Sequence, residues 1–343
     1  MDDALAQINR KSKIQNLKSL AVIASLILGL LAAPLAAEAQ QPGKIVRVGL
    51  LAGGSPASMA PYVDALREGL RELGYVEGRN LAIEARYAEG KAERVAELAA
   101  ELVRLKVHVI VSGAISAIRT AKDATSTIPL VMAAVADPLE SEIVGSLARP
   151  GGNITGVSAL AVGYSAKWLE LLKEASPKTS RVAVLRSPSN PSHAGYWREM
   201  QAAGPVLGVT VQPFDVRAPD EYTTAFVAMT KERAGALIVL PDPLTLVHQT
   251  QIVDLAAKHR LPAMYWQREF VERGGLMAYG ANLRDIFRRA ATFVDKILKG
   301  AKPGDLPVEQ AVRVELMINL KTAKALGLIF PQSILVRADQ IIQ

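Results

Sequence analysis

Two patterns of apolar residues take turns along most of the chain. Runs that are apolar throughout and of strand length, such as IVRVGLLAG (45–53) and VHVIVSGA (107–114), precede stretches with apolar residues at helical spacing, such as 57–75. Strands of this kind between amphipathic helices are typical of parallel sheets covered by helices on both faces. We therefore predict an α/β fold with doubly wound parallel sheets.

The alternation is interrupted once, at SLARPGGNITGVS (146–158). Its Pro-Gly-Gly-Asn cluster is typical of a turn, and a helix is predicted just before it, over 138–148. A single large sheet with a surface loop here is one interpretation. Because similar alternation flanks the break on both sides, we favour two sheets of about five strands each. The first lobe is predicted over 45–157 and the second from residue 158.

The N-terminal segment differs from the rest. Residues 1–39 carry Arg10, Lys11, Lys13 and Lys18, then an apolar run over 20–33 and a small-x-small pattern at 37–39. The apolar run is shorter than the about 20 residues of a spanning helix. We predict a secretory signal peptide over 1–39, the alternative being an uncleaved membrane anchor. The chain has no cysteine to carry a lipid, so a free periplasmic protein is expected.

Composition and motifs exclude several classes of function. The formal net charge is +7, but no basic block or basic helix face accounts for it, so nucleic-acid binding is not expected. The absence of cysteine excludes disulfides and thiolate chemistry, and the four histidines have no metal-ligand spacing. No catalytic motif is present. We predict a protein that is not an enzyme and needs no cofactor or metal.

Four loops that follow predicted strands share one sequence motif, a small polar or acidic residue followed by a proline. They are Ser55-Pro56, Asp137-Pro138, Asn190-Pro191 and Asp242-Pro243. Each residue alone could simply cap a helix. Together they would place free N–H groups of helix N-termini around one crevice, which suits a carboxylate or phosphate. The two aspartates suit a cationic group, so the mixture indicates a zwitterion such as an amino acid.

Other residues are expected at the same rim. Ser112-Gly113-Ala114 ends a strand, and Tyr164, Tyr196, Trp197 and the Tyr265-Trp266 pair lie near the loops. Trp168 shares a helix face with leucines and is predicted to be core, while Tyr62 could line the first loop. The candidate ligand contacts are Gly54, Ser55, Ser112, Gly113, Ala114, Asp137, Tyr164, Ser189, Asn190, Asp242, Tyr265 and Trp266.

Longer stretches resemble a known family. Five segments are similar to ABC-transporter substrate-binding proteins: ALREGLRELGYVEGRNLAIEARYAEGKAERVAELAAELVRLKVHVIV, ATSTIPLVMAAVADPL, GSLARPGGNITGVS, GGLMAYGANLRDIFRRAATFVDKILKGAKPGDLPVEQ and ELMINLKTAKALGL. This is the branch of type I periplasmic binding proteins that includes members binding tryptophan and other aromatic amino acids. The resemblance covers nearly the whole chain after the N-terminal segment.

The resemblance implies two Rossmann-like lobes that are joined by a hinge and close on a ligand. It implies that 281–310 return to the first lobe, so that the second lobe spans 158–280, and it leaves the strand-helix tail 311–343 unassigned. It further implies ligand contacts at Ser55, Ser112, Asp137, Asn190 and Asp242. The chain departs from the family pattern at 112–115 and at 136–138, and both departures fall in the expected pocket.

These observations predict a periplasmic solute-binding protein of an ABC import system. It would capture a small polar or zwitterionic ligand, an amino acid being one candidate, by hinge closure. Its partners would be an ABC permease and the cytoplasmic ATPase of that permease, with contact to the membrane only through the permease. Two alternatives remain, an exported α/β enzyme using Asp137 or Asp242 as acid or base, and a protein that presents its ligand to a sensory receptor.

Overall fold

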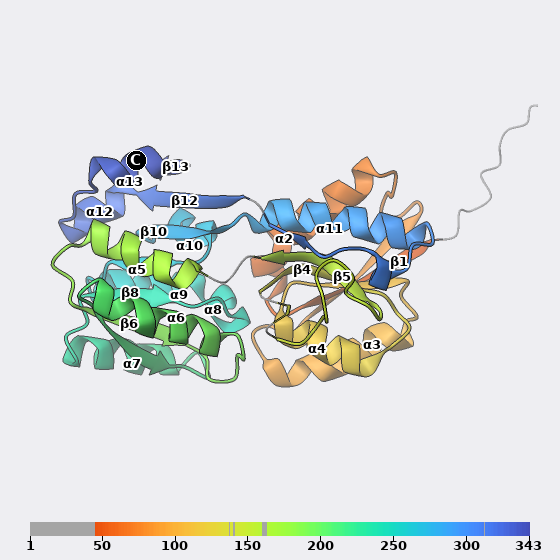
Figure 1. Cartoon of the computed structure of the whole chain (residues 1–343), viewed down its shortest axis with the longest axis horizontal. Coiled ribbons are helices and arrows are strands. Elements are labelled where there is room, and N and C mark those ends of the chain that lie inside the picture. Colours follow the sequence, from red (N-terminus) through yellow and green to blue (C-terminus); the bar gives the residue numbers. More distant parts are fainter. Residues whose placement is uncertain (1–44, 137, 140, 160–162, 312) are drawn as a thin grey trace, which may run out of the picture. The chain divides into compact units, whose positions relative to one another are not determined.

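The computed structural model describes residues 45–136, 138–139, 141–159, 163–311 and 313–343. The strands of this part form two sheets, as predicted (Figure 1). The first has the order β11-β5-β4-β3-β1-β2 and the second the order β13-β12-β10-β9-β8-β6-β7. We call each sheet with its covering helices a lobe.

The first lobe has parallel strand pairing throughout. Its strands are β1 (Val46–Ala52), β2 (Leu81–Tyr87), β3 (Val109–Ser112), β4 (Leu130–Ala136), β5 (Ile154–Ala159) and β11 (Glu309–Gln310). Its helices are α2 (Pro56–Glu72), η1 (Ala92–Arg94), α3 (Val95–Arg104), α4 (Ile115–Ala124), α11 (Leu283–Leu298) and η2 (Pro303–Asp305).

The second lobe is also mostly parallel, but β12 runs antiparallel to β10. Its strands are β6 (Arg181–Arg186), β7 (Thr210–Asp215), β8 (Ala236–Val239), β9 (Ala263–Tyr265), β10 (Met277–Ala281), β12 (Val314–Asn319) and β13 (Gln340–Ile342). Its helices are α5 (Tyr164–Ala175), α6 (His193–Val206), α7 (Glu221–Lys231), α8 (Pro243–Val247), α9 (Gln249–Lys258), α10 (Arg268–Glu272), α12 (Leu320–Leu326) and α13 (Gln332–Arg337).

Each sheet is buried on both faces, which explains why its central strands are apolar at every position. In the first lobe, α2 and α11 pack together over one face and α3 and α4 over the other (Figure 1). In the second lobe, α5 and α6 cover one face, and α7, α9 and α10 cover the other. Every residue of β3 and of β8 is buried.

The strand number exceeds the predicted five per sheet, because three late strands join. β11 adds to the first sheet beside β5, and β12 and β13 extend the second sheet beyond β10. The late helix α11 packs on α2 of the first lobe. The chain thus passes between the lobes after β5, after β10 and after β11.

The helix predicted over 138–148 is wrong, since none forms among its described residues. Glu142 has a left-handed backbone, with φ of 56°, which stops helix propagation. The amides of Ile143 and Val144 both donate to the Pro138 carbonyl instead, and this compact turn buries the two apolar side chains. The apolar residues of this segment are therefore spaced to be buried in a turn and do not indicate a helix.

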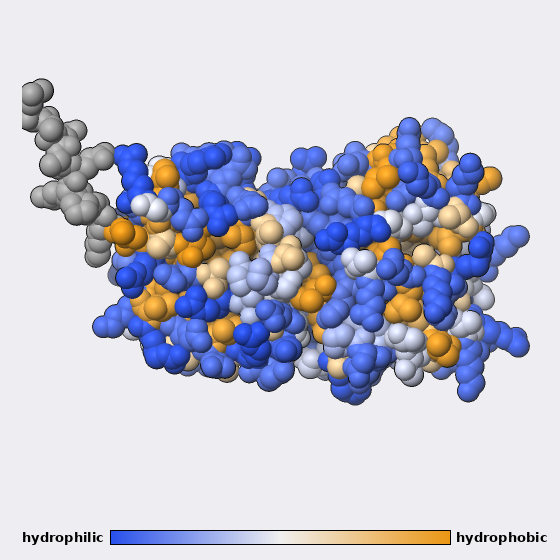
Figure 2. Space-filling model, turned by 180° about the vertical axis from the view of Figure 1, so that it is seen from behind, coloured by the Kyte–Doolittle hydropathy of each residue, from blue (hydrophilic) through white to orange (hydrophobic). Residues whose placement is uncertain are grey.

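The surface is mixed in character. Figure 2 shows hydrophilic side chains over most of one face, with separate apolar patches between them. Across the described residues no helix is both long enough and apolar enough to cross a bilayer. Within the same residues there is no cluster of three or more His, Asp or Glu side chains that could hold a metal ion.

Candidate functional site: a cavity between the two lobes

A cavity of about 150 Å³ opens where the carboxyl ends of strands from both sheets meet. Its walls come from the loops after β1, β3, β6, β8 and β9 and from the ends of β4, β5 and β10. Ligands of open parallel sheets bind at this edge. An engineered apolar cavity of about the same size holds one benzene molecule. The cavity therefore has room for a ring-sized group.

The wall from the first lobe consists largely of backbone and methyl groups. The glycines and alanines in it are Ala52, Gly53, Gly54, Gly113, Ala114, Ala133, Ala134, Ala136 and Ala159. At Gly113 a Cβ atom would lie 2.6 Å from the carbonyl oxygen of Ala133, so a larger residue there would displace β4. Behind the small residues, the Tyr62 and Phe287 rings lie 5.5 Å apart between centroids and close the wall.

Ala134 has an unusual backbone for a residue within a strand. Its φ is 75°, in the region that disfavours every residue except glycine, and the register of β4 against β5 shifts between Ala133 and Val135. A bulge of this kind re-aims a strand beside a functional site. Here it turns the end of β4 along the cavity, where Ala133, Ala134 and Ala136 all contribute to the lining.

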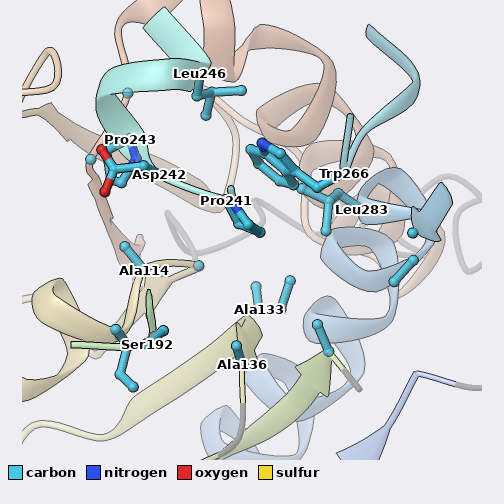
Figure 3. Close-up of a pocket in the computed structure, with 18 of the residues that line it drawn as sticks. Ala114, Ala133, Ala136, Ser192, Pro241, Asp242, Pro243, Leu246, Trp266 and Leu283 are labelled. Carbon is cyan, nitrogen blue, oxygen red and sulfur yellow. The ribbon is translucent and has the colours of Figure 1, made fainter. Parts of the chain in front are cut away.

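The wall from the second lobe is aromatic. Trp266 follows β9, Tyr164 and Trp168 begin α5, and Tyr196 lies on α6. Figure 3 shows Trp266 and Leu283 on one side of the cavity, with Asp242 and Ala114 on the other. The site thus has an apolar end and a polar end.

Two polar atoms in the aromatic wall are buried without a hydrogen-bond partner among the described residues. They are the indole Nε1 of Trp266 and the hydroxyl of Tyr164. Burial, together with the nearby Tyr279, raises the pKa of Tyr164 to about 12, so its hydroxyl keeps its proton and can donate. Buried polar atoms are nearly always paired in native proteins, which makes these two candidates for contact with a ligand or water.

Asp242 is held by a rigid network at the polar end. It caps α8 by accepting a hydrogen bond from the Leu244 amide at 2.8 Å, and its other oxygen accepts one from the Asn190 side chain at 2.9 Å. The carboxylate is nine-tenths buried. Its position is therefore set by the protein, and each of its oxygens retains lone-pair capacity for a further donor.

His193 supports this network from behind. Its Nδ1 accepts from the Ser187 amide at 3.0 Å, so the proton lies on Nε2, which donates to the Pro241 carbonyl at 3.0 Å. Burial lowers the pKa of His193, despite the opposing effect of Asp242, and keeps the ring neutral. The histidine thus orients the backbone that carries Asp242, and it does not line the cavity itself.

Two helices of the first lobe, α2 and α4, begin at the cavity, and the hydrogen bonding of their N-termini differs. The N-terminus of α2 is closed by a reciprocal pair of bonds between Ser55 and Ser58. The N-terminus of α4 has Ala114 as its cap and receives no side-chain cap from the described residues. The first turn of α4 includes Ile115 and Ser116, and both residues line the cavity. Free amides at a helix start favour a negative group.

The structure brings together seven of the twelve predicted contacts. These line the cavity: Gly54, Gly113, Ala114, Tyr164, Asn190, Asp242 and Trp266. Asp137 falls outside the described residues. The remaining four, Ser55, Ser112, Ser189 and Tyr265, lie away from the cavity lining.

Each of those four has another role in the fold. Ser55 caps α2, and Ser112 is fully buried with its hydroxyl donating to the Leu51 carbonyl. Ser189 pairs with the Ser187 hydroxyl. Tyr265 is buried and stacks on Phe270, with ring centroids 4.6 Å apart. Of the Tyr265-Trp266 pair, only the tryptophan faces the cavity.

Other lining residues carried no clear signal in the sequence. Trp168 is buried in the core as predicted, yet its ring also reaches the cavity. The alanines of β4 and β5 look like any buried strand. Leu246 and Phe287 have helical apolar spacing. For the alanines, only the position at a strand's carboxyl end could have indicated a role in the cavity.

The lobes also contact each other beside the cavity. The Gln267 side chain of the second lobe donates to the Tyr62 hydroxyl of the first lobe. Near them, Glu269 is buried and pairs with Arg284 at 3.2 Å, and burial raises the pKa of its carboxyl. Tyr62 and Arg284 belong to α2 and α11, while Gln267 and Glu269 belong to the α10 region.

Comparisons with known proteins agree with this arrangement. The family model for ABC transporter substrate binding proteins matches residues 48–342. A tyrosine-binding protein of Clostridioides difficile is 26% identical over 273 residues, 78% of each chain. A domain from Streptococcus pneumoniae in complex with L-Trp is 28% identical with a TM-score of 0.80, covering 87% of this chain and 100% of that one. A conserved domain protein from Vibrio cholerae is 26% identical with a TM-score of 0.81, at the same coverage.

Proposed function

The chain belongs to the ABC transporter substrate binding protein family, and we propose that it captures an amino acid with an aromatic or large apolar side chain and delivers it to an ABC permease. The observation that carries this proposal is the polarity of the cavity. One end presents an aromatic wall, and the other presents Asp242 opposite the uncapped start of α4. A free amino acid has the matching polarity.

The aromatic end favours the side chain. Trp266, Tyr164, Trp168 and Tyr196 all line the cavity of about 150 Å³, and aromatic pairs gain about 0.5–1.5 kcal/mol beyond the area they bury. The unpartnered Trp266 Nε1 and Tyr164 hydroxyl would allow a polar ring atom on the ligand. Relatives that bind tyrosine and tryptophan support this choice of ligand class.

The polar end favours the backbone of the amino acid. The carboxylate would accept from the first-turn amides of α4, where the helix dipole also favours a negative group. The ammonium group would donate to Asp242, whose position Asn190 and Leu244 already fix. A charged hydrogen bond to a preorganised, buried carboxylate is among the stronger contacts available.

Delivery would use closure of the two lobes about the three connecting segments. The ligand would stabilise the closed arrangement because only that arrangement lets it contact both walls. With the predicted signal peptide, the protein would be exported to the periplasm and would meet the permease and its cytoplasmic ATPase there. The relatives named above bind tyrosine or hold L-Trp, which supports binding without turnover.

A thermal-shift panel of L-Trp, L-Tyr, L-Phe, L-Leu, L-Glu and D-galactose tests the proposal. An amino acid at about 100 times its dissociation constant adds roughly 2.7 kcal/mol to the free energy of unfolding, which raises Tm by several degrees. We expect the aromatic amino acids to raise Tm most and to be recovered unchanged. A shift given only by galactose or L-Glu would contradict the ligand class, and consumption of the ligand would indicate an enzyme.

A further inference from the structure

The cavity side of the first lobe has a patch of glycines that faces α8 of the second lobe. Gly53 and Gly54 follow β1, and Gly90 lies in the loop after β2. The two loops are tied together, because the Gly90 amide donates to the Gly53 carbonyl at 2.7 Å and the Glu89 amide donates to the Gly54 carbonyl at 3.1 Å. The patch is therefore one fixed surface, which we call the glycine floor.

The first turn of α8 lies directly on this floor. A Cβ atom at Gly53 would come within 2.7 Å of Pro243 Cγ and 2.9 Å of Pro243 Cβ. One at Gly54 would lie 3.3 Å from Leu246, and one at Gly90 would lie 3.3 Å from the Cα of Leu244. Leu246 is itself buried within the core cluster of the first lobe. The two lobes thus pack closely here, and at Gly53 the packing against Pro243 leaves no room for a methyl group.

A substitution at Gly53 can test the contact between the lobes without disturbing the fold of the first lobe. Its backbone is outside the left-handed region, so alanine is conformationally allowed. In the described part of its own lobe, the nearest atom to such a methyl group is the Ala114 Cβ at 3.8 Å, an ordinary contact. A methyl group at this position would therefore collide only with Pro243 of the other lobe.

We propose that the seating of α8 on the glycine floor is the contact that limits lobe closure, and that Gly53 sets how near the lobes can approach. This inference rests on the proposed function, in which closure on a ligand gives the affinity. Gly53 would then be a positioning residue that controls affinity without offering the ligand a side chain. A variant that disfavours the closed arrangement lowers apparent affinity in proportion to the lost closed population.

The test compares four proteins by calorimetric titration with L-Trp, L-Tyr and L-Phe. They are the wild type, Gly53→Ala, the double variant Gly53→Ala/Pro243→Gly, and the matched control Gly145→Ala. Gly145 lies in the same lobe, has ordinary φ, and no described atom lies within 4 Å of a Cβ built there. Melting without ligand checks that each variant folds.

We expect Gly53→Ala to bind roughly tenfold or more weakly than wild type with an unchanged ligand-free Tm, since overpacking at a tight contact has a cost of that order. Gly145→Ala should match wild type, and the double variant should recover part of the loss. Binding by Gly53→Ala within twofold of wild type would overturn the proposal, and so would a loss that Pro243→Gly does not relieve.

The two proposals fail differently. If wild type binds none of the three amino acids, the proposed ligand class fails, and the closure contact is judged by small-angle scattering with whichever other member of the thermal-shift panel raises Tm. A larger radius of gyration for Gly53→Ala than for wild type and Gly145→Ala would still support the contact. Identical scattering by all three proteins would overturn it.

Discussion

The two walls of the cavity are formed by different types of residue. The first lobe contributes glycines, alanines and the amides of a helix start, with the Tyr62 and Phe287 rings behind them, whereas the second contributes Trp266, three other aromatic rings and Asp242. The first wall thus defines space and offers backbone donors, and the second wall offers side chains that recognise chemistry. A change in the second wall should alter whether a ligand is bound, while a change in the first should alter which size is accepted.

The two walls are also held in place by different kinds of contact. The first wall is held by close backbone contacts, such as Gly113 against the Ala133 carbonyl and the bulge at Ala134. The second wall is held by side-chain networks, such as Asp242 with Asn190 and His193 with Pro241. Substitutions in the second wall can therefore be chosen to keep the fold and remove a single group.

The largest effect is expected for Trp266→Ala. Removing this ring takes away a large aromatic surface at the apolar end, and anchors of this type cost about 2 kcal/mol or more when truncated, or about 30-fold in affinity. Calorimetric titration with L-Trp measures the loss. Trp197→Ala is the control, because Trp197 is absent from the cavity lining and packs under Arg186. Equal losses for both variants would contradict the assignment.

Asp242→Asn should reduce affinity by about tenfold or more. Asparagine is as good a helix cap as aspartate, so the fold is kept while the charge facing the ammonium group is lost. Titration with L-Trp and with indole separates the effects, since indole has no ammonium group and should lose little. Asp220→Asn serves as control at a helix start away from the cavity. An unchanged affinity for L-Trp would remove Asp242 from the site.

Ala136→Val tests the first wall with a smaller change. Two added methyl groups narrow the cavity, so affinity for L-Trp should fall several-fold more than affinity for L-Leu. Ala136→Gly is the matched change in the opposite direction and should not lower affinity for L-Trp. If both ligands weaken equally in Ala136→Val, this wall does not select by size.

Tyr62→Phe should lower stability by about 1 kcal/mol, because it removes the hydroxyl that accepts from Gln267 across the lobes and keeps the ring against Phe287. Denaturant unfolding measures the change. Tyr222→Phe is the control, since that buried hydroxyl has no partner in the described chain and its removal should not destabilise. A free energy of unfolding of Tyr62→Phe equal to that of wild type would show that the contact between lobes contributes nothing.

The smallest effect concerns pH. Burial lowers the pKa of His193 below its ordinary value of about 6.5, so the unfolded chain takes up this proton first. His193 therefore makes the free energy of unfolding decrease as the pH falls below about 6.5, until its lowered pKa is passed. An NMR titration of the ring, assigned with His193→Gln, checks the shift. A midpoint at or above 6.5 would be inconsistent with a buried neutral ring.

The alternating pattern was sufficient to predict two sheets with parallel central strands, because strands buried on both faces must be apolar throughout, but it did not predict that β12 runs antiparallel to β10. It failed at 138–148, where apolar residues are buried by a turn. It also undercounted strands, since β11 and β13 have only two and three residues and gain their pairing from strands distant in sequence. Short strands of this kind depend on tertiary contacts that local patterns do not encode.

The candidate site was predictable where chemistry and position coincide. Asp242, Asn190 and Trp266 follow strands and carry distinctive side chains, and all three line the cavity. The glycine floor and the alanines of β4 could not be found in this way, because their role is the absence of a side chain opposite another lobe. That role becomes visible only when the distance from Gly53 to Pro243 is known.

The most direct test of the account is a crystal structure of the protein with the amino acid that raises Tm most. We predict its side chain against Trp266 and the alanines of β4, its carboxylate at the start of α4, and its ammonium group at Asp242. A ligand bound outside this cavity, or one whose charged groups lie at Trp266 while its side chain faces Asp242, would contradict the division of roles between the two walls.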